Sequence, residues 1–351
     1  MSSSNYKILG FVFSIMLFFG SCKTAMLYTT LDVLRPAQVE FSPDVEKILI
    51  VNNSTIQPAN FGHTTRSLGG QLQTLEIETD SAALFTLSVL AEEIENTDFF
   101  NSVDLLLNSI NNNSDFTSIT PLQKTSLREL YKIYDVDAIL SLDHMVVKDE
   151  IREYYNSEWN EYLALLAVRY ETLWSIHHPQ KIGVTAVHFK DSLFWESESY
   201  NRAQMQGGLP DRQDAIIDGA LFVGQNSAKR FIPHWEKSDR YFYDSANKLM
   251  KQGMDSVYVK NWEAALSLWN QIFNSTNNIK LKAQAANNIA IVSEITGDYD
   301  KALEFAKISF DLSSTKVLTD DTSLARLSSY IVELFRRKRE IEILNKQLGR
   351  E

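Results

Sequence analysis

Residues 161–177, EYLALLAVRYETLWSIH, contain the pattern that decides the fold of the first half of this chain. Between residues 168 and 176, every second side chain is apolar or a threonine, and Arg169 and Glu171 lie between them. A period of two is typical of a β-strand with one buried face. We therefore predict a long strand over residues 161–177.

A second strand is predicted over residues 183–198, after a short connection that contains His178 and Pro179. The two strands form an antiparallel hairpin. If the connection spans residues 178–183, His188 pairs with Leu173.

The segments before the hairpin alternate between strand and helix patterns. KILIVN, residues 47–52, is a continuous aliphatic run typical of a strand that is buried on both faces. Further strands are predicted over residues 99–105 and 135–147, and helices over residues 80–96, 120–134 and 211–230. The order βαβαβββα predicts an α+β domain with a mixed sheet over residues 45–235.

The tail, residues 241–348, has no strand pattern and contains a repeat with a period close to 37 residues. Lys260–Leu266 aligns with Gly297–Leu303, and small residues recur at equivalent positions. The two units resemble tetratricopeptide repeats, which implies an all-helical domain whose last helix, about residues 323–348, covers the open end.

In tetratricopeptide proteins, the first helix of each unit lines a concave binding groove. This resemblance makes Asn287, Asn288 and Glu294 candidates for polar contacts to a protein partner. The alternative is that the repeats only pack on the sheet domain, and the sequence leaves both open.

The N-terminus resembles a lipoprotein signal peptide. Residues 1–21 combine Lys7, a short apolar stretch and the small residues Gly20 and Ser21, and Cys22 follows. We expect the Cys22 thiol to be acylated and to anchor the protein to a lipid bilayer, with residues 22–44 as a tether. The residues after Cys22 are not acidic, which favours the outer membrane facing the periplasm.

Charge and cysteine content exclude several function classes. Cys22 is the only cysteine, so no disulfide is expected, and the formal net charge of −11 argues against nucleic-acid binding. The basic run at residues 336–339 is interpreted as a solvated helix face.

We find no catalytic motif. His177 and His188 would lie about 13 Å apart on the hairpin, too far to share a zinc ion, and no nucleophile elbow or phosphate-binding loop is present. The carboxylate pairs Glu92/Glu93 and Glu196/Glu198 are interpreted as chance pairs in an acidic protein. We therefore expect no catalytic residue, cofactor or metal ion.

Aromatic side chains concentrate near the predicted domain junction, at Phe194, Trp195, Trp235 and residues 241–243. We expect them to form a core between the domains; the alternative is a platform that binds a sugar or a peptide.

The whole chain resembles an uncharacterised family of Bacteroidetes lipoproteins with a tetratricopeptide tail. The residues that carry the resemblance are Ser21–Cys22, Leu34–Ala37, Lys47–Asn52, the strands with Trp174 and Trp195, Pro233–Trp235, Arg240–Tyr243, Trp262–Ala265 and Ala286–Ala290. The resemblance implies a cell-envelope location and the two-domain architecture only. Because no catalytic motif is found and the repeats offer a surface to a partner, we expect a non-enzymatic adaptor or assembly factor that binds an envelope protein. The alternative is a periplasmic enzyme or glycan-binding protein that acts on cell-wall or polysaccharide material. The sequence leaves the oligomeric state open.

Overall fold

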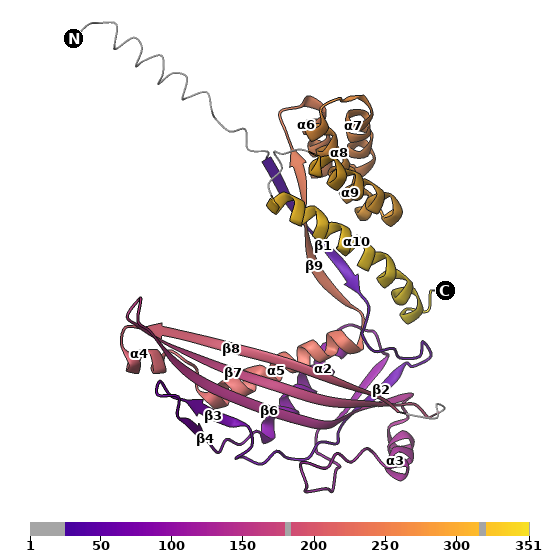
Figure 1. Ribbon diagram of the computed structural model, residues 1–351. Helices are drawn as coiled ribbons and strands as arrows, with labels where there is room; N and C mark the ends of the chain where they lie inside the picture. The colour runs from indigo at the N-terminus through magenta and orange to yellow at the C-terminus, as the bar shows by residue number, and fades with distance from the viewer. Residues whose placement is uncertain (1–24, 180–183, 316–320, 351) are drawn as a thin grey trace, which may run out of the picture. The chain divides into compact units, whose positions relative to one another are not determined.

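The computed structural model describes residues 25–179, 184–315 and 321–350. The chain forms two compact units (Figure 1). Of the described residues, the sheet unit comprises those within Pro36–His234 and Leu344–Arg350, and the helical unit comprises Ala25–Arg35 and those within Trp235–Ile343. The chain is therefore α+β, with a sheet domain followed by an all-helical region. The predicted signal peptide and Cys22 lie outside the described residues.

Seven strands form the sheet of the first unit: β2 (Lys47–Asn52), β3 (His63–Arg66), β4 (Leu72–Thr74), β5 (Ser102–Leu106), β6 (Ala138–Asn156), β7 (Glu161–His177) and β8 (Thr185–Ser199). The long strand β6 is central. On one side it pairs with β7, which pairs with β8, and both pairings are antiparallel. On the other side it pairs in parallel first with β2 and then with β3, and β5 and β4 lie outside these two.

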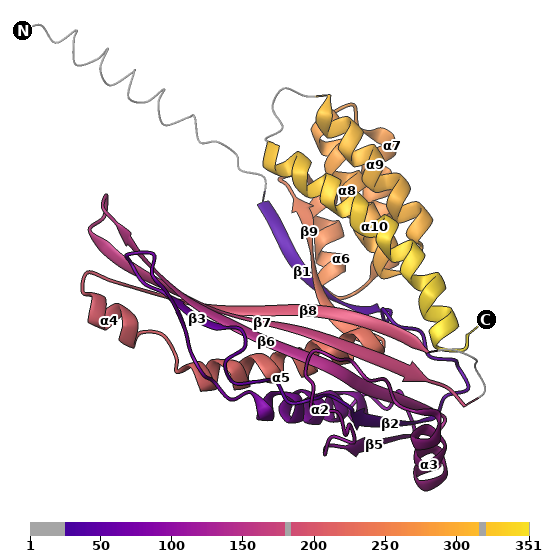
Figure 2. The same cartoon turned by 60° about the horizontal axis from the view of Figure 1, so that its bottom comes forward.

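Four helices accompany this sheet: α2 (Asp80–Glu95), α3 (Lys124–Tyr134), α4 (Arg202–Gly207) and α5 (Arg212–Phe231). Helices α2 and α5 cover one face (Figure 2) and bury Ile48 and Ile50 of β2 in the main core. Leu49 and Val51 of the same strand pack on the opposite face with Leu130 of α3. The aliphatic run is thus buried on both faces, as its sequence predicts.

Several predicted elements need correction. Strand β7 has the predicted bounds, and His188 is paired with Leu173 as expected. The structure adds β3, β4 and α4 to the predicted order. The helix expected from residue 120 begins at Lys124, because the Thr120 carbonyl accepts a hydrogen bond from the Asn53 side chain.

The helical unit also contains two strands, β1 (Ala25–Arg35) and β9 (His234–Asp244), which pair as a ribbon. The Tyr28 ring lies 6.2 Å from the Tyr241 ring, and the Thr30 hydroxyl donates to Asp239. Residue numbers of the contacts rise along β1, from Tyr28 to Thr30, and fall along β9, from Tyr241 to Asp239. The two strands are therefore antiparallel. Part of the expected tether over residues 22–44 is therefore strand β1, and β9 extends into the tail that the sequence predicts to be helical from residue 241.

Five helices complete this unit: α6 (Lys248–Tyr258), α7 (Trp262–Ser275), α8 (Ile279–Ile295), α9 (Tyr299–Ser314) and α10 (Asp321–Gln347). The α6–α7 and α8–α9 turns have the same geometry. Lys260 and Gly297 both have positive φ, and the next residue in each turn donates its N–H to a carbonyl five residues earlier, Ser256 or Ser293. The turns thus repeat with the predicted period.

Among the described residues, none of the helices is both long and apolar enough to cross a membrane.

Candidate functional site

The predicted groove residues lie on α8 and are buried. Asn287 is 1%, Asn288 0% and Glu294 5% exposed. All three contact β9, which lies along α8 and which the sequence analysis did not predict. The expectation that they face an open groove is therefore wrong in this structure, because the chain's own strand occupies their side of the helix.

Asn287 and Asn288 hold the backbone of β9. The Asn288 side chain accepts a hydrogen bond from the Tyr243 N–H and donates one to the Tyr243 carbonyl, both at 2.8 Å. The Asn287 amide donates to the Tyr241 carbonyl at 3.0 Å. A carboxamide that satisfies both backbone groups of one residue replaces a neighbouring strand and recognises extended chain independently of sequence.

Glu294 binds a side chain of the same strand. The Arg240 guanidinium donates to both Glu294 oxygens at 2.8 and 2.7 Å, and the Tyr330 hydroxyl of α10 donates to the same carboxylate at 3.0 Å. Burial and the nearby Glu294 carboxylate raise the pKa of Tyr330 well above its ordinary value, so the phenol remains a donor. These contacts join β9, α8 and α10.

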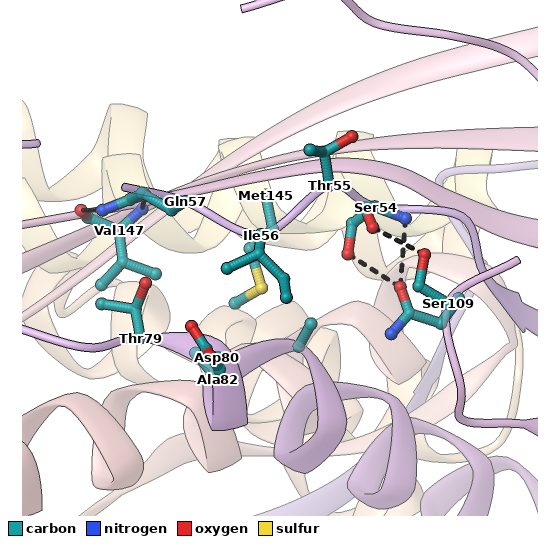
Figure 3. A pocket seen from close by; sticks show the side chains of 12 residues that line it. Ser54, Thr55, Ile56, Gln57, Thr79, Asp80, Ala82, Ser109, Met145 and Val147 are labelled. Atoms are coloured by element: carbon teal, nitrogen blue, oxygen red, sulfur yellow. Dashed lines mark hydrogen bonds between the residues drawn. The ribbon is translucent and has the colours of Figure 1, made fainter. Parts of the chain in front are cut away.

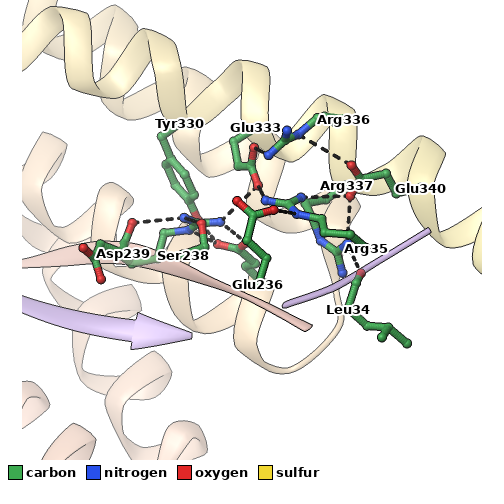
Figure 4. A network of polar contacts seen from close by, with 12 residues as sticks. Leu34, Arg35, Glu236, Ser238, Asp239, Tyr330, Glu333, Arg336, Arg337 and Glu340 are labelled. Atoms are coloured by element: carbon green, nitrogen blue, oxygen red, sulfur yellow. Dashed lines mark hydrogen bonds and ion pairs between the residues drawn. The ribbon is translucent and has the colours of Figure 1, made fainter. Parts of the chain in front are cut away.

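A second group of ion pairs secures β1 (Figure 4). The buried Arg35 guanidinium donates to Glu236 of β9 at 2.7 Å and to Glu333 and Glu340 of α10 at 2.6 and 2.8 Å. Burial alone would raise the pKa of Glu333, but the Arg35 guanidinium holds it below its ordinary value. Arg35 is therefore the charged centre that fixes β1 to β9 and α10.

The basic run at residues 336–339 belongs partly to this network. Arg337 is only 6% exposed; it donates to the Leu34 carbonyl of β1 at 2.7 Å and to Glu340 at 2.9 Å. Arg336 donates to Glu333. The interpretation of this run as a solvated face is therefore wrong for Arg337, which anchors β1.

Next to the contacts of Asn287 and Arg240 lies a cavity of about 540 Å³, within the range of small-molecule sites. Its walls come from β1, β9, α8 and α10. They comprise Tyr28, Ser238, Asp239, Arg240, Tyr241, Asn287, Ile291, Thr322, Ala325, Arg326, Ser329, Tyr330 and Glu333.

The sheet unit has a small pocket at the carboxyl end of β2, beside the start of α2 (Figure 3). Its volume is about 50 Å³, enough for a few water molecules. The Ser54 hydroxyl donates to Asn52, and the Ser109 hydroxyl donates to the Ser54 carbonyl. These side chains satisfy the backbone where the strand ends.

A serine, a histidine and an aspartate meet inside the sheet but do not form a relay. A β-bulge at Asp143 directs its carboxylate to the hydroxyls of Ser141 and Ser175, and Ser141 lies 3.2 Å from His177 Nε2. The carboxylate thus accepts from the hydroxyls and not from the imidazole, and all four side chains are buried. Burial lowers the pKa of His177. No cluster of three or more metal-ligating side chains exists among the described residues.

The aromatic residues expected to form a core between the domains are divided between the two units. Trp195 packs against the core of the sheet unit, and Phe242 belongs to the core of the helical unit. Phe194 and Trp235 are 67% and 68% exposed. The aromatic run therefore serves two separate cores and leaves two rings at the surface.

The end of the sheet at the β6–β7 turn is rich in exposed aromatic rings. We call this surface the aromatic end: it comprises Tyr154, Trp159 and Tyr200 near the turn and Phe194 further along β8, opposite Ala167 of β7; its rings are between 49% and 71% exposed. Tyr154 and Phe194 share one sheet face by register, and every second residue of β8 from Ala186 to Glu198 is exposed. Glu158, Glu196 and Glu198 lie among these rings, and the described residues offer them no ion pair.

Comparison with known families covers both units. Residues 45–243 match the model of a family described as a domain of unknown function, DUF8603. The chain belongs to the DUF8603 family. Residues 251–336 match a second model with the same description, DUF6340. No curated protein matches the chain.

One solved structure, titled "Crystal structure of uncharacterized protein", is 10% identical to the chain. The match covers 54% of this chain and 95% of that chain with a TM-score of 0.24, which carries no structural argument.

The DUF8603 match contains the aromatic end and the β9 part of the cavity wall, whereas the α8 and α10 walls fall in the DUF6340 match. Sequence reasoning missed Tyr28 and Arg326 as cavity residues. The only signal was the aromatic run at residues 241–243, because the cavity exists only once β1 and β9 have paired.

Proposed function

We propose that this protein is a lipid-anchored cell-envelope adaptor that binds an envelope protein and catalyses no reaction. The proposal keeps the expected acylation of Cys22 and an outer-membrane location facing the periplasm. It also keeps the tetratricopeptide-like nature of the helical unit and membership of the Bacteroidetes lipoprotein family.

The observation that carries the adaptor proposal is the aromatic end of the sheet. Tyrosine and tryptophan are enriched at protein interfaces because large rings supply contact area at low cost in side-chain entropy. Several large exposed rings at one end of a sheet often mark a binding surface. Trp159, Phe194 and Tyr200 are the most exposed of these residues, at 68%, 67% and 71%, and Trp159 and Phe194 are the more apolar anchors.

The charges around these rings favour one kind of partner. Glu158, Glu196 and Glu198 are exposed and have no ion pair among the described residues, whereas the exposed Arg169 lies on the same face beside Phe194. The part of the surface toward the β6–β7 turn is therefore acidic and attracts a protein with a basic patch. The helical groove is less suited to this role, because β9 already occupies the side chains that would hold an extended segment of a partner.

The anchor acts on the helical unit. Cys22 precedes Ala25 by three residues, a span of at most about 11 Å. Because Arg35 fixes β1 to β9 and α10, an acyl group on Cys22 holds this unit directly at the bilayer without the predicted long tether.

In-cell crosslinking of the full-length tagged chain, followed by mass spectrometry, tests the proposal. The double variant Trp159→Ser/Phe194→Ser should lose a specific envelope protein that the wild type recovers. The matched control is Tyr258→Ser/Val332→Ser, which removes two exposed apolar side chains from the helical unit and should keep the partner. Equal recovery by all three chains would contradict the proposal.

Cell-wall glycan fragments provide the test of the alternative class. Saturable binding of glycan by the wild type, lost in Trp159→Ser, would replace the adaptor proposal with a glycan-binding protein, since exposed rings beside carboxylates also suit sugars.

A further inference from the structure

We propose that the 540 Å³ cavity of the helical unit binds a small molecule with an anionic group, a carboxylate or phosphate, on a planar apolar body. This site is separate from the aromatic end and does not depend on the adaptor proposal. It lies between the β1–β9 ribbon and helices α8 and α10.

Arg326 is the residue that selects an anion. Its guanidinium lies 5.2 Å from the centre of the Tyr241 ring, and its nearest polar contacts, Tyr28 Oη, Met26 Sδ and the Thr322 carbonyl, are 3.4 to 3.5 Å away. No carboxylate of the described side chains pairs with it. A guanidinium that is oriented by stacking on a ring and lacks an acidic partner keeps its planar fork available for a carboxylate or phosphate.

The other charges of the cavity wall are already compensated or lie further along the ribbon. Arg240 is neutralised by Glu294, and Glu333 is neutralised by Arg35 and Arg336. Asp239, which lies on β9 two residues before Tyr241, accepts a hydrogen bond from the Thr30 hydroxyl. This carboxylate repels an anion placed at its own end, so the favourable position is at Arg326.

The remaining wall suits a flat apolar body. Tyr28 and Tyr241 supply rings beside Arg326, Tyr330 supplies a third ring, and Ile291 and Ala325 add aliphatic surface. Burial raises the pKa of Tyr241, so its phenol stays neutral at physiological pH. Rings flanking a cation bind planar anionic molecules through stacking and charge together.

Phenyl phosphate is the probe, titrated calorimetrically into the full chain in detergent. We expect saturable binding at one site, at least tenfold weaker binding in Arg326→Gln, and partial recovery in Arg326→Lys. Arg128→Gln is the matched control, because it removes the same charge from an exposed position on α3 and should bind like the wild type. Ser329→Trp provides a second variant that fills the cavity and leaves Arg326 intact, and it should also lose binding.

The source of the anionic group is distinguished with the chain in lipid nanodiscs. Loss of phenyl phosphate binding in phosphatidylglycerol discs, with retention in phosphatidylcholine discs, would identify a lipid headgroup as the occupant. Retention in both would identify a soluble molecule. Absence of phenyl phosphate binding to the wild type in detergent, or equal binding by wild type and Arg326→Gln, would overturn the proposal.

Discussion

The side-chain amide of Asn288 on α8 satisfies both the N–H and the carbonyl of Tyr243 on β9, at 2.8 Å each. A residue 45 positions later in the chain therefore acts as the neighbouring strand that β9 lacks on this side. The relationship explains why the helical unit includes the ribbon: its central helix binds extended backbone, and the bound segment belongs to the same chain.

Asn288→Leu should lower the free energy of unfolding of the helical unit by about 3 kcal/mol, because two backbone groups lose their partner in a site where Asn288 itself is fully buried. Urea denaturation followed by circular dichroism measures the change. Asn277→Ala, on an exposed connection, is the control and should change stability by less than about 0.5 kcal/mol. A similar loss of unfolding free energy in both variants would show that the Asn288 side chain does not hold the β9 backbone.

Arg35→Met should destabilise the helical unit by about 3 kcal/mol at pH 7, since Glu333 and Glu340 then lose the buried cation that binds both and keep only Arg336 and Arg337. The folded-state pKa of Glu333 lies below its ordinary value of 4.5, so its contribution is present above pH 4.5 and is lost as the pH falls through the folded-state pKa.

In the Arg35→Met variant, Glu333 has lost the Arg35 guanidinium. Protonation of Glu333 at low pH therefore removes the free-energy cost of its buried charge. The stability difference from the wild type should therefore narrow between pH 7 and pH 4 in urea titrations. Lys237→Met removes an exposed charge from β9 and should show no such pH dependence. A constant difference across this range would mean that Arg35 acts through packing alone.

Lys260→Gly should stabilise the helical unit by about 1 kcal/mol, because Lys260 has φ +55° in a turn where the equivalent residue is Gly297. The reciprocal Gly297→Ala should destabilise by about 1 kcal/mol, and the cause is conformation alone, since an added Cβ meets nothing within 4 Å. Thermal unfolding of both variants provides the check. The same sign of change in both would show that the turns are not equivalent.

Gly253→Ala should cost about 2 kcal/mol, since its Cβ would lie 2.3 Å from Nε1 of the buried Trp269. Trp269→Phe in the same chain should recover part of the loss, as expected for coupled neighbours. Gly207→Ala, where the space is open, is the control for chemical denaturation. Additive effects of the two substitutions would exclude the predicted clash.

Local patterns were sufficient to predict the elements that carry their own periodicity. Strand β7 and the continuous aliphatic strand β2 have the predicted bounds, because burial of one or both faces determines their residue order. The repeat was visible because its two turns use the same chemistry at Asn261 and Asp298, whose side chains cap the following helices.

The ribbon could not be predicted in this way. Strands β1 and β9 lie about 200 residues apart in the chain, and much of their stability comes from charged contacts such as Arg35–Glu236. A buried arginine gives no apolar signal, and its partners on α10 follow it by about 300 residues. The cavity at Arg326 depends on this long-range pairing and was missed for the same reason.

Site-specific photocrosslinking in cells tests the proposed function most directly. A photoreactive amino acid placed at position 194, within the aromatic end, should yield a discrete adduct with one envelope protein that has a basic surface patch. The same amino acid at position 258, equally exposed on the helical unit, should not yield it. No adduct from position 194, or the same adducts from both positions, would contradict the adaptor account.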